Sequence, residues 1–280
     1  MMSTVDSVKE LRERTGAGIL DCQAALKASG GEMEKAIDFL RKKGMAQAAK
    51  RAGREAKEGL VVAGVESHRI ALVEVNCETD FVARTDDFKD LAQMAIQETL
   101  QHGDQAMSSQ KLSARVAELS GKIGEKILVK RCKLVATENG TLFNYIHSNQ
   151  KIGVVVELAV AKAESKKNAE LAELGKNLAM QVAASNPMCL ARTEMPAATL
   201  EREKAIYREE VKGKPENIVE KIIQGKLDKF YQGNCLLEQL FIKDDKKSIQ
   251  QLVNEVAKKI GDNIQIVKFV RFQLGESLAS

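Results

Sequence analysis

The sequence predicts an α+β protein made of an N-terminal three-helix bundle, a core of two α+β subdomains and a projecting antiparallel helical hairpin. Three observations support this fold class. Residues 3–43 carry apolar side chains at helical spacing and contain no strand-like run. From residue 58 the period changes, and runs rich in β-branched residues alternate with helical segments. Residues 196–231 carry two narrow apolar stripes on either side of a Gly-Lys-Pro turn.

The composition excludes several classes of protein. The 280 residues are 44% hydrophobic and 29% charged, which is ordinary for a globular chain. No apolar run approaches the roughly 18 residues of a membrane span, and the start lacks the basic and apolar segments of a secretory signal. The five cysteines form no Cys-x-x-Cys pair, so a reducing cytosol is expected, without disulfides or a zinc site. We therefore expect a cytoplasmic protein that contacts no membrane and holds no metal or cofactor.

Residues 1–45 are predicted to form the bundle. Apolar residues at helical spacing predict a first helix over the opening residues, a second over residues 19–28 and a third over residues 32–43. Glycine-containing turns separate them, because glycine favours turn conformations that a helix excludes. Gly44 is expected to end the third helix. The loop and the length of this segment resemble the ubiquitin-associated type of three-helix domain.

Residues 46–57 are predicted to be a basic linker helix. Between Arg41 and Lys57 the chain has seven Lys or Arg residues and one acid, Glu55. One interpretation is a surface that faces RNA or phosphate, because such surfaces are basic. The other is a solvated helix that alone connects the bundle to the body, and the many alanines favour it. We prefer the linker.

Residues 58–140 are predicted to form the first core subdomain. Its expected elements are, in chain order, strands 59–65 and 69–75, helices 88–101 and 112–123, and strand 127–136. The first two strands should form a hairpin. The last should pair with a strand over residues 141–147 across Asn139-Gly140, because Asn-Gly is a strong hairpin signal.

Residues 141–195 and 232–280 are predicted to form the second core subdomain, into which the hairpin of residues 196–231 is inserted. The expected elements of this subdomain after its first strand are strand 152–160, helix 168–184, helix 248–260 and strand 264–274. Pro196 and Pro215 should begin the two hairpin helices, since the fixed backbone angle of proline suits the first helical turn.

No group of residues in the sequence points to an enzyme. A chain that hydrolyses GTP would carry Gly-x-x-x-x-Gly-Lys-Ser/Thr after a strand, and this one does not. A cysteine nucleophile could be assembled from Cys77, Glu78 and His147, but nothing in the sequence indicates a depressed thiol pKa. The three histidines are too dispersed for a metal site. The sequence therefore indicates a protein that acts by binding.

The junction at Thr79-Asp80-Phe81-Val82 lies between a predicted buried strand and the start of a predicted helix. Its aromatic ring lies between an acid, Asp80, and a short polar turn. Such a ring either packs into its own core, which is the common fate of phenylalanine, or inserts into a partner.

Two stretches resemble the signatures of the elongation factor Ts family. One is Leu11–Leu26, which runs LRERTGAGILDCQAAL, and the other is Glu74–Arg84, which runs EVNCETDFVAR. Shorter stretches at Lys122–Ile127, Tyr145–His147 and Ile152–Val154 follow in the family's order. The resemblance as a whole extends over residues 3 to about 275, which is almost the whole chain.

The chain also departs from the family pattern. Family members often carry two methionines where Ile19 and Leu20 stand, and a lysine at Gln23. The apolar pair keeps its character, whereas the glutamine lacks the charge. Many members carry a further helical module after the last strand, which we expect to be absent because the chain ends at Ser280.

The resemblance implies a guanine-nucleotide exchange factor that binds elongation factor Tu in its GDP-bound and nucleotide-free forms. It implies no direct nucleic-acid partner. By this resemblance, four residues dislocate Mg²⁺ from the nucleotide site of the partner: Thr79, Asp80, Phe81 and Val82. Six others match family residues that contact the partner: Arg12, Ile19, Leu20, Ile123, Gly124 and His147.

Two alternatives remain open at this point. His147 matches a family histidine near the phosphate loop of the partner, but it could instead cap its own strand. The chain as a whole could be an RNA- or ribosome-binding adaptor that uses the basic residues 41–57, in which case its binding would depend strongly on salt.

Overall fold

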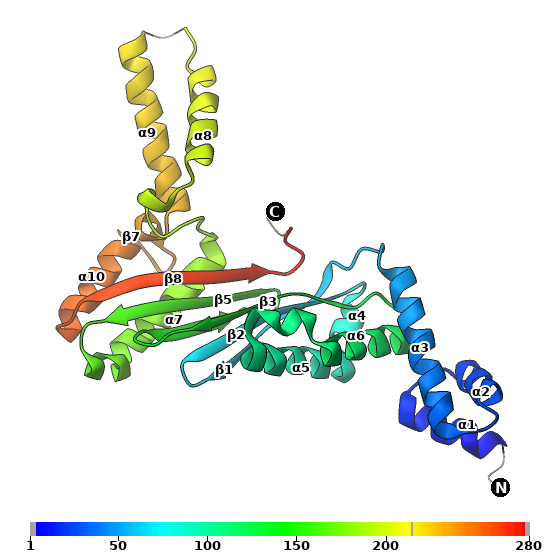
Figure 1. Cartoon of the computed structure of the whole chain (residues 1–280). Coiled ribbons are helices and arrows are strands. Elements are labelled where there is room, and N and C mark those ends of the chain that lie inside the picture. Colours follow the sequence, from blue (N-terminus) through cyan, green and yellow to red (C-terminus); the bar gives the residue numbers. More distant parts are fainter. Residues whose placement is uncertain (1–3, 214, 278–280) are drawn as a thin grey trace. The chain divides into compact units, whose positions relative to one another are not determined.

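The computed structural model describes residues 4–213 and 215–277, and residues 1–3, 214 and 278–280 lie outside the described part. The described chain is a mixed α+β structure with N-terminal helices and several small antiparallel sheets, which confirms the predicted fold class at that level (Figure 1). It divides into two compact units. Unit 1 comprises the described residues of Met1–Val135, Ser148–Ile152 and Phe272–Ser280, and unit 2 comprises Ala136–His147 and Gly153–Arg271.

Unit 1 contains the bundle and a three-stranded sheet. Its elements are α1 (Thr4–Thr15), α2 (Ile19–Ala28), α3 (Met33–Arg51), β1 (Glu58–Glu66), β2 (Arg69–Cys77), α4 (Asp80–Ala83), α5 (Asp86–His102), the 3-10 helix η1 (Gly103–Ser108), α6 (Gln110–Ile123) and most of β3 (Leu128–Ala136). The strands lie in the order β1-β2-β3, and β1 pairs with β2 as the predicted antiparallel hairpin. Helix α5 packs on β1 and β2. The resulting core includes Val73, Val75, Phe88 and Leu91.

The prediction that Gly44 ends the third helix is wrong, because α3 continues to Arg51. Gly44 is buried where α3 packs against α6. A Cβ atom added to Gly121 of α6 would lie only 3.0 Å from the Cα of Gly44. Glycine inside a helix costs about 1 kcal/mol relative to alanine, and here it permits the close approach of two helices. The bundle is therefore held by packing as well as by the chain, so the prediction of attachment through the linker alone is also wrong.

The prediction of a hairpin across Asn139-Gly140 is wrong as well. Strand β3 belongs to the sheet of β1 and β2, whereas β4 (Thr141–Ile146) pairs with β5 (Ile152–Val160) in a second sheet. The Gly140 N–H donates a 2.8 Å hydrogen bond to Thr137 Oγ1, whose hydroxyl bonds to the Glu157 carboxylate at 2.5 Å. Sheet pairing with long apolar strands thus prevails over a local turn signal.

Unit 2 contains the second sheet, in the order β4-β5-β8, and the helical hairpin. Its elements after β5 are η2 (Ala163–Lys167), α7 (Ala169–Ser185), η3 (Arg192–Glu194), α8 (Ala197–Glu210), α9 (Glu216–Asn234), η4 (Leu236–Glu238), β6 (Leu240–Phe241), β7 (Asp244–Ser248), α10 (Ile249–Ile260) and most of β8 (Ile264–Gln273). Helix α7 packs on β4 and α10 packs on α7. The short β6–β7 pair was not predicted.

The two hairpin helices begin where the prolines predict, with Pro196 preceding α8 and Pro215 preceding α9. They pack along each other, as Figure 1 shows. Val211, Ile223 and Leu227 of this hairpin are buried. Narrow apolar stripes are enough for two helices that cover each other.

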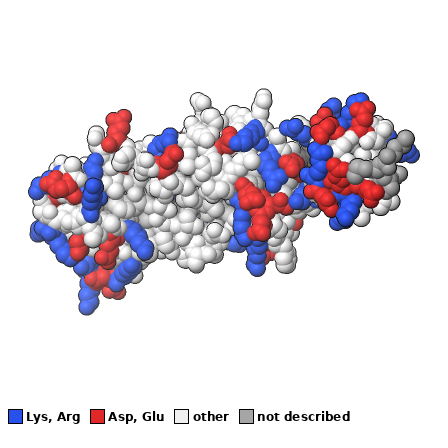
Figure 2. All heavy atoms as spheres, turned by 90° about the horizontal axis from the view of Figure 1, so that it is seen from below, with Lys and Arg blue, Asp and Glu red and all other residues white. Residues whose placement is uncertain are grey.

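The surface carries charges of both signs. On the face drawn in Figure 2, basic and acidic side chains of the described residues are interspersed without a broad patch of one sign, in keeping with a formal net charge of +4. Among residues 4–213 and 215–277, no helix has the length and apolar character needed to cross a membrane.

Candidate functional site

The four-residue helix α4 exposes the ring of Phe81. Val82 and Ala83 lie in the core of unit 1, with exposed fractions of 7% and 6%. Phe81 precedes them and is 78% exposed. One helical turn thus buries two adjacent side chains and directs the third, larger one to solvent. The alternative in which Phe81 packs into its own core is excluded.

The turn that presents Phe81 is fixed by a carboxylate from another segment. Glu125 follows α6, and its Oε2 accepts hydrogen bonds from the backbone N–H groups of Glu78 and Thr79, both at 3.1 Å. Its Oε1 accepts a 2.7 Å bond from the Thr79 hydroxyl. Bonds to an ionised acceptor are stronger than neutral ones. Neither the role of Glu125 nor these bonds were predicted from the sequence.

Glu78 makes the reciprocal contact. Its Oε1 accepts a 2.6 Å bond from the backbone N–H of Lys126 and a 3.2 Å bond from Arg54. The bond from the Lys126 N–H, followed by the pairing with Arg54, holds the pKa of Glu78 below its ordinary value. Lys126 Nζ in turn donates to the carbonyl oxygens of Ala52 and Arg54. Two carboxylates therefore join the segment after β2, the segment after α6 and the segment after α3.

Asp80 begins α4 and pairs with Arg84 at 2.7 Å. The Arg84 side chain is 77% exposed and the Asp80 side chain is 45% exposed, so water screens the pair and it contributes little to stability. The carboxylate remains accessible to another cation.

The structure brings Ile123 and Gly124 to the same place as the Phe81 turn, since both directly precede Glu125 in the chain. Gly124 ends α6 in the left-handed conformation, with φ 88°, which glycine adopts at little cost. A Cβ on Gly124 would meet no atom of the described residues within 4 Å. Ile123 is half-buried against the core of unit 1.

The residues Arg12, Ile19 and Leu20 lie on the surface of the bundle. Ile19 is 50% exposed and Leu20 is 79% exposed at the start of α2. The bundle's own core is formed by Leu11, Cys22 and their neighbours. The two exposed side chains are therefore apolar surface, with the exposed Arg12 on the adjacent helix α1.

His147 belongs to unit 2, where it follows β4 and is half-buried. One of its ring nitrogens, Nδ1, lies 2.9 Å from the hydroxyl of Tyr145. This hydrogen bond fixes the ring orientation and leaves the other nitrogen for a further contact.

The thiol of Cys77 is no candidate nucleophile. Burial raises its pKa to about 12, and the nearby Glu125 and Glu58 carboxylates add to the rise. Within the part of the chain that the structure describes, no three His, Cys, Asp or Glu residues are grouped to hold a metal ion.

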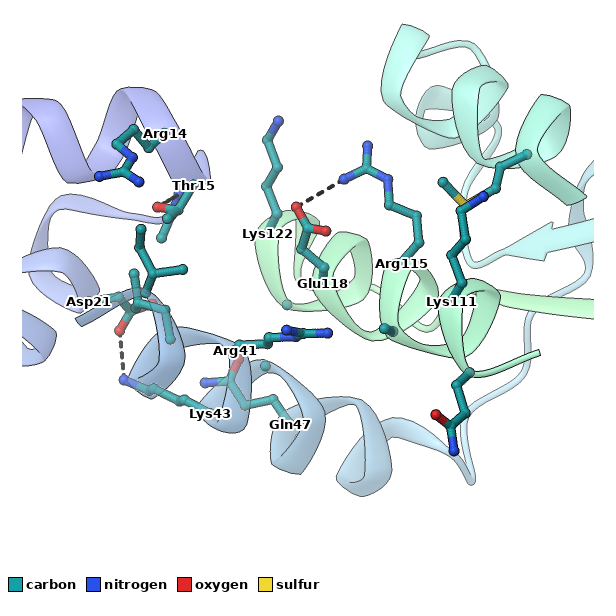
Figure 3. A pocket seen from close by; sticks show the side chains of 18 residues that line it. Arg14, Thr15, Asp21, Arg41, Lys43, Gln47, Lys111, Arg115, Glu118 and Lys122 are labelled. Carbon is teal, nitrogen blue, oxygen red and sulfur yellow. Dashed lines mark hydrogen bonds and ion pairs between the residues drawn. The ribbon is translucent and has the colours of Figure 1, made fainter. Parts of the chain in front are cut away.

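A basic cavity of 640 Å³ lies between the bundle and α6 (Figure 3). Its cationic lining residues are Arg14, Arg41, Lys43, Lys111, Arg115 and Lys122. Five of these six form ion pairs with acidic side chains, such as Lys43 with Asp21 at 2.7 Å. The sixth, Arg41, forms no ion pair with any of the described residues.

The basic segment of residues 41–57 makes internal contacts as well. Arg51 donates to the Ser120 carbonyl oxygen at 3.1 Å, and Arg54 pairs with Glu78. Arg51 and Arg54 thus connect the end of α3 and the segment after it to the rest of unit 1, as expected of a linker more than of an RNA-binding surface.

Comparisons with known proteins agree with the resemblance. The family model described as "Elongation factor TS" matches residues 78–276. A protein named elongation factor Ts from Prosthecochloris aestuarii is 45% identical over 284 aligned positions, covering 96% of this chain and 97% of the relative. Proteins of the same name from Nitratidesulfovibrio vulgaris and Clostridium perfringens are both 42% identical, and they cover 100% and 99% of this chain, and 98% and 94% of the relatives.

Proposed function

The chain belongs to the elongation factor Ts family, and from this premise we propose that it releases GDP from elongation factor Tu through the turn at Thr79–Val82. Its function is that of the family: it is the nucleotide exchange factor for elongation factor Tu in translation elongation. The chain is therefore not an enzyme, and it acts by binding its partner.

The proposed mechanism is distortion of the partner's nucleotide site. A GTPase holds its nucleotide largely through Mg²⁺ and through backbone amides around the phosphates. In this account, Phe81 inserts between helices of the partner's nucleotide domain, and Asp80 enters beside the Mg²⁺ site. The residues that support the metal then shift, Mg²⁺ is lost and GDP leaves.

The free energy that Phe81 can contribute is smaller than the free energy that nucleotide release requires. Burial of one phenylalanine contributes about 1.5–3 kcal/mol. A thousandfold loss of nucleotide affinity requires about 4 kcal/mol of coupling. Phe81 can therefore supply a large part of the distortion, and further contacts must supply the rest.

We assign these further contacts to two places in unit 1 and one in unit 2. The exposed Ile19 and Leu20, with Arg12 beside them, would grip another helix of the same nucleotide domain. Ile123 and Gly124 would contact it next to Phe81. His147 would approach the phosphate loop with the ring nitrogen that Tyr145 leaves unused.

Val82 has a different part in this proposal. Its side chain is buried in the core of unit 1. It would anchor α4 while Phe81 inserts, and it would make no direct contact of its own.

We further propose that the chain consists of five segments. They are the ubiquitin-associated-like bundle of residues 1–45, the linker of residues 46–57, the core subdomain of residues 58–140, the subdomain of residues 141–195 and 232–280, and the projecting hairpin of residues 196–231. Elongation factor Tu would bind in both its GDP-bound and its nucleotide-free forms, in the cytoplasm. The hairpin, whose helices cover each other, would assist binding without being central to exchange.

The exposure of Phe81 carries the proposal, since the ring is 78% exposed on a turn whose neighbours are buried. The test is to mix the purified chain with elongation factor Tu loaded with fluorescent GDP, and to follow release against excess unlabelled GDP. We expect release to accelerate in proportion to chain concentration and then to saturate. A release rate equal to that of elongation factor Tu alone would contradict the proposal.

A further inference from the structure

We propose that Glu125 is a positioning residue for nucleotide exchange, acting through the Asp80–Phe81 turn. This inference rests on the proposed function of that turn. Glu125 makes no contact with the partner in this proposal. Its hydrogen bonds hold the backbone of the turn in the conformation that exposes the Phe81 ring.

The start of α4 takes its support from a distant side chain. The first N–H groups of a helix have no partner within the helix, and a threonine at the preceding position usually accepts a bond from one of them. Thr79 stands at that position and, within the described structure, makes no such bond. Its hydroxyl donates to Glu125 instead. The turn therefore depends on a side chain that lies 46 positions further along the chain.

A carboxylate suits the chemistry of the contact. All three groups that bond to the Glu125 side chain are donors: two backbone N–H groups and one hydroxyl. An ionised carboxylate offers only acceptors, so one side chain satisfies all three. A single backbone carbonyl or hydroxyl could not replace it with the same number of bonds.

Glu125 is itself held in place. Its carbonyl oxygen accepts a 2.5 Å bond from the Ser120 hydroxyl, and the adjacent Lys126 N–H donates to Glu78. The left-handed Gly124 reverses the chain just before it. Each of the two segments, the one after α6 and the one after β2, thus donates a backbone N–H to a carboxylate of the other. These bonds restrict the backbone at Phe81 when a partner presses against the ring.

Two variants of the full-length chain separate positioning from charge. Glu125→Ala removes all three bonds. Glu125→Gln keeps the shape: its amide oxygen can accept both N–H bonds while its NH₂ group donates to the Thr79 hydroxyl. With fluorescent GDP on elongation factor Tu, we expect Glu125→Ala to lower the saturating release rate about tenfold and to change the half-saturating concentration less than about threefold. Glu125→Gln should keep the saturating rate within about threefold of the wild type.

Glu98→Ala is the matched structural control. Glu98 is another carboxylate of unit 1 that accepts bonds from two side chains, Ser109 at 2.7 Å and Lys111 at 3.0 Å, away from the turn. Glu98→Ala should lower stability in a urea melt, as Glu125→Ala should, and should leave the saturating release rate unchanged.

A double-mutant cycle with Phe81→Ala completes the test. If Glu125 acts through the ring, Glu125→Ala should slow release less than about twofold in the Phe81→Ala background. A full tenfold loss in that background would overturn the proposal, and so would a Glu125→Ala variant that is as active as the wild type. These outcomes are separate from failure of the proposed function, in which the wild-type chain itself would not accelerate GDP release.

Discussion

Phe81 and Phe88 lie seven positions apart in one stretch of unit 1 and have opposite environments. Phe88 is 0% exposed and packs in the core, whereas Phe81 is 78% exposed. The difference comes from the chain between them. Helix α4 ends after one turn at Ala83, and α5 begins afresh at Asp86.

One phenylalanine therefore stabilises the fold of unit 1, whereas the other is available for the proposed function. Phe88 is supported by the apolar side chains of the core around it. Phe81 is supported through its backbone, by the hydrogen bonds of Glu125 and by the burial of Val82. A change at the first site should therefore affect folding, and a change at the second should affect the partner.

The largest expected effect is at Phe88. Phe88→Ala removes a fully buried ring, which should lower the free energy of unfolding by about 3–5 kcal/mol. Urea denaturation followed by circular dichroism measures this. A loss below about 1 kcal/mol would remove the contrast with Phe81.

The next effect concerns the crossing of α3 and α6. Gly121→Val places a branched side chain where even a Cβ lies 3.0 Å from Gly44, and should cost about 1–3 kcal/mol. The matched control is Gly225→Val in α9, where a Cβ meets no atom of the described residues within 4 Å, and its cost should stay below about 0.5 kcal/mol. Equal urea midpoints for the two variants would refute a close helix crossing.

Leu20 extends the comparison to the bundle. Because this side chain is 79% exposed, Leu20→Ala should leave stability within about 0.5 kcal/mol of the wild type. It should weaken binding to elongation factor Tu by about 1–2 kcal/mol, as loss of a central apolar contact does. The half-saturating concentration in GDP release reports this loss, and an unchanged value would show that the bundle surface does not contact the partner.

We expect the contribution of Glu78 to the free energy of unfolding to depend on pH. Its pKa is lower in the folded protein than its ordinary value of 4.5, so its stabilisation is complete above that pH and is lost as pH falls through the folded pKa. Glu78→Gln should therefore be less stable than the wild type by about 1 kcal/mol at pH 7. In urea melts this difference should shrink as the pH falls below 4.5. A difference that stays constant as the solution is made strongly acidic would mean that the charge of Glu78 is not involved.

Much of the fold followed from sequence patterns, and the errors have a common cause. Apolar spacing predicted α2, β5 and α10 closely, because each element buries one face in a regular way. The wrong predictions, at Gly44 and at Asn139-Gly140, came from local turn signals that distant contacts override. Gly44 is accommodated by Gly121 on another helix, and β4 pairs with β5. Neither partner is visible from the local sequence.

The candidate site divides in the same way. The signature around Phe81 was recognisable from the sequence, and the structure adds that the ring is exposed. The role of Glu125 could not be predicted, since 46 positions separate it from Thr79 and only folding brings them into contact. A hydrogen bond between residues far apart in the chain leaves no repeating pattern in the sequence from which it could be predicted.

The most direct test of the account is Phe81→Ala, with a denaturant melt and stopped-flow GDP release measured on the same preparation. We predict a free energy of unfolding within about 1 kcal/mol of the wild type, as at other surface positions, together with slower GDP release from elongation factor Tu at a saturating concentration of the chain. Asp80→Ala should behave in the same direction and more mildly. A Phe81→Ala variant that is several kcal/mol less stable, or one that is equally stable and fully active, would contradict the central claim that this exposed ring drives exchange.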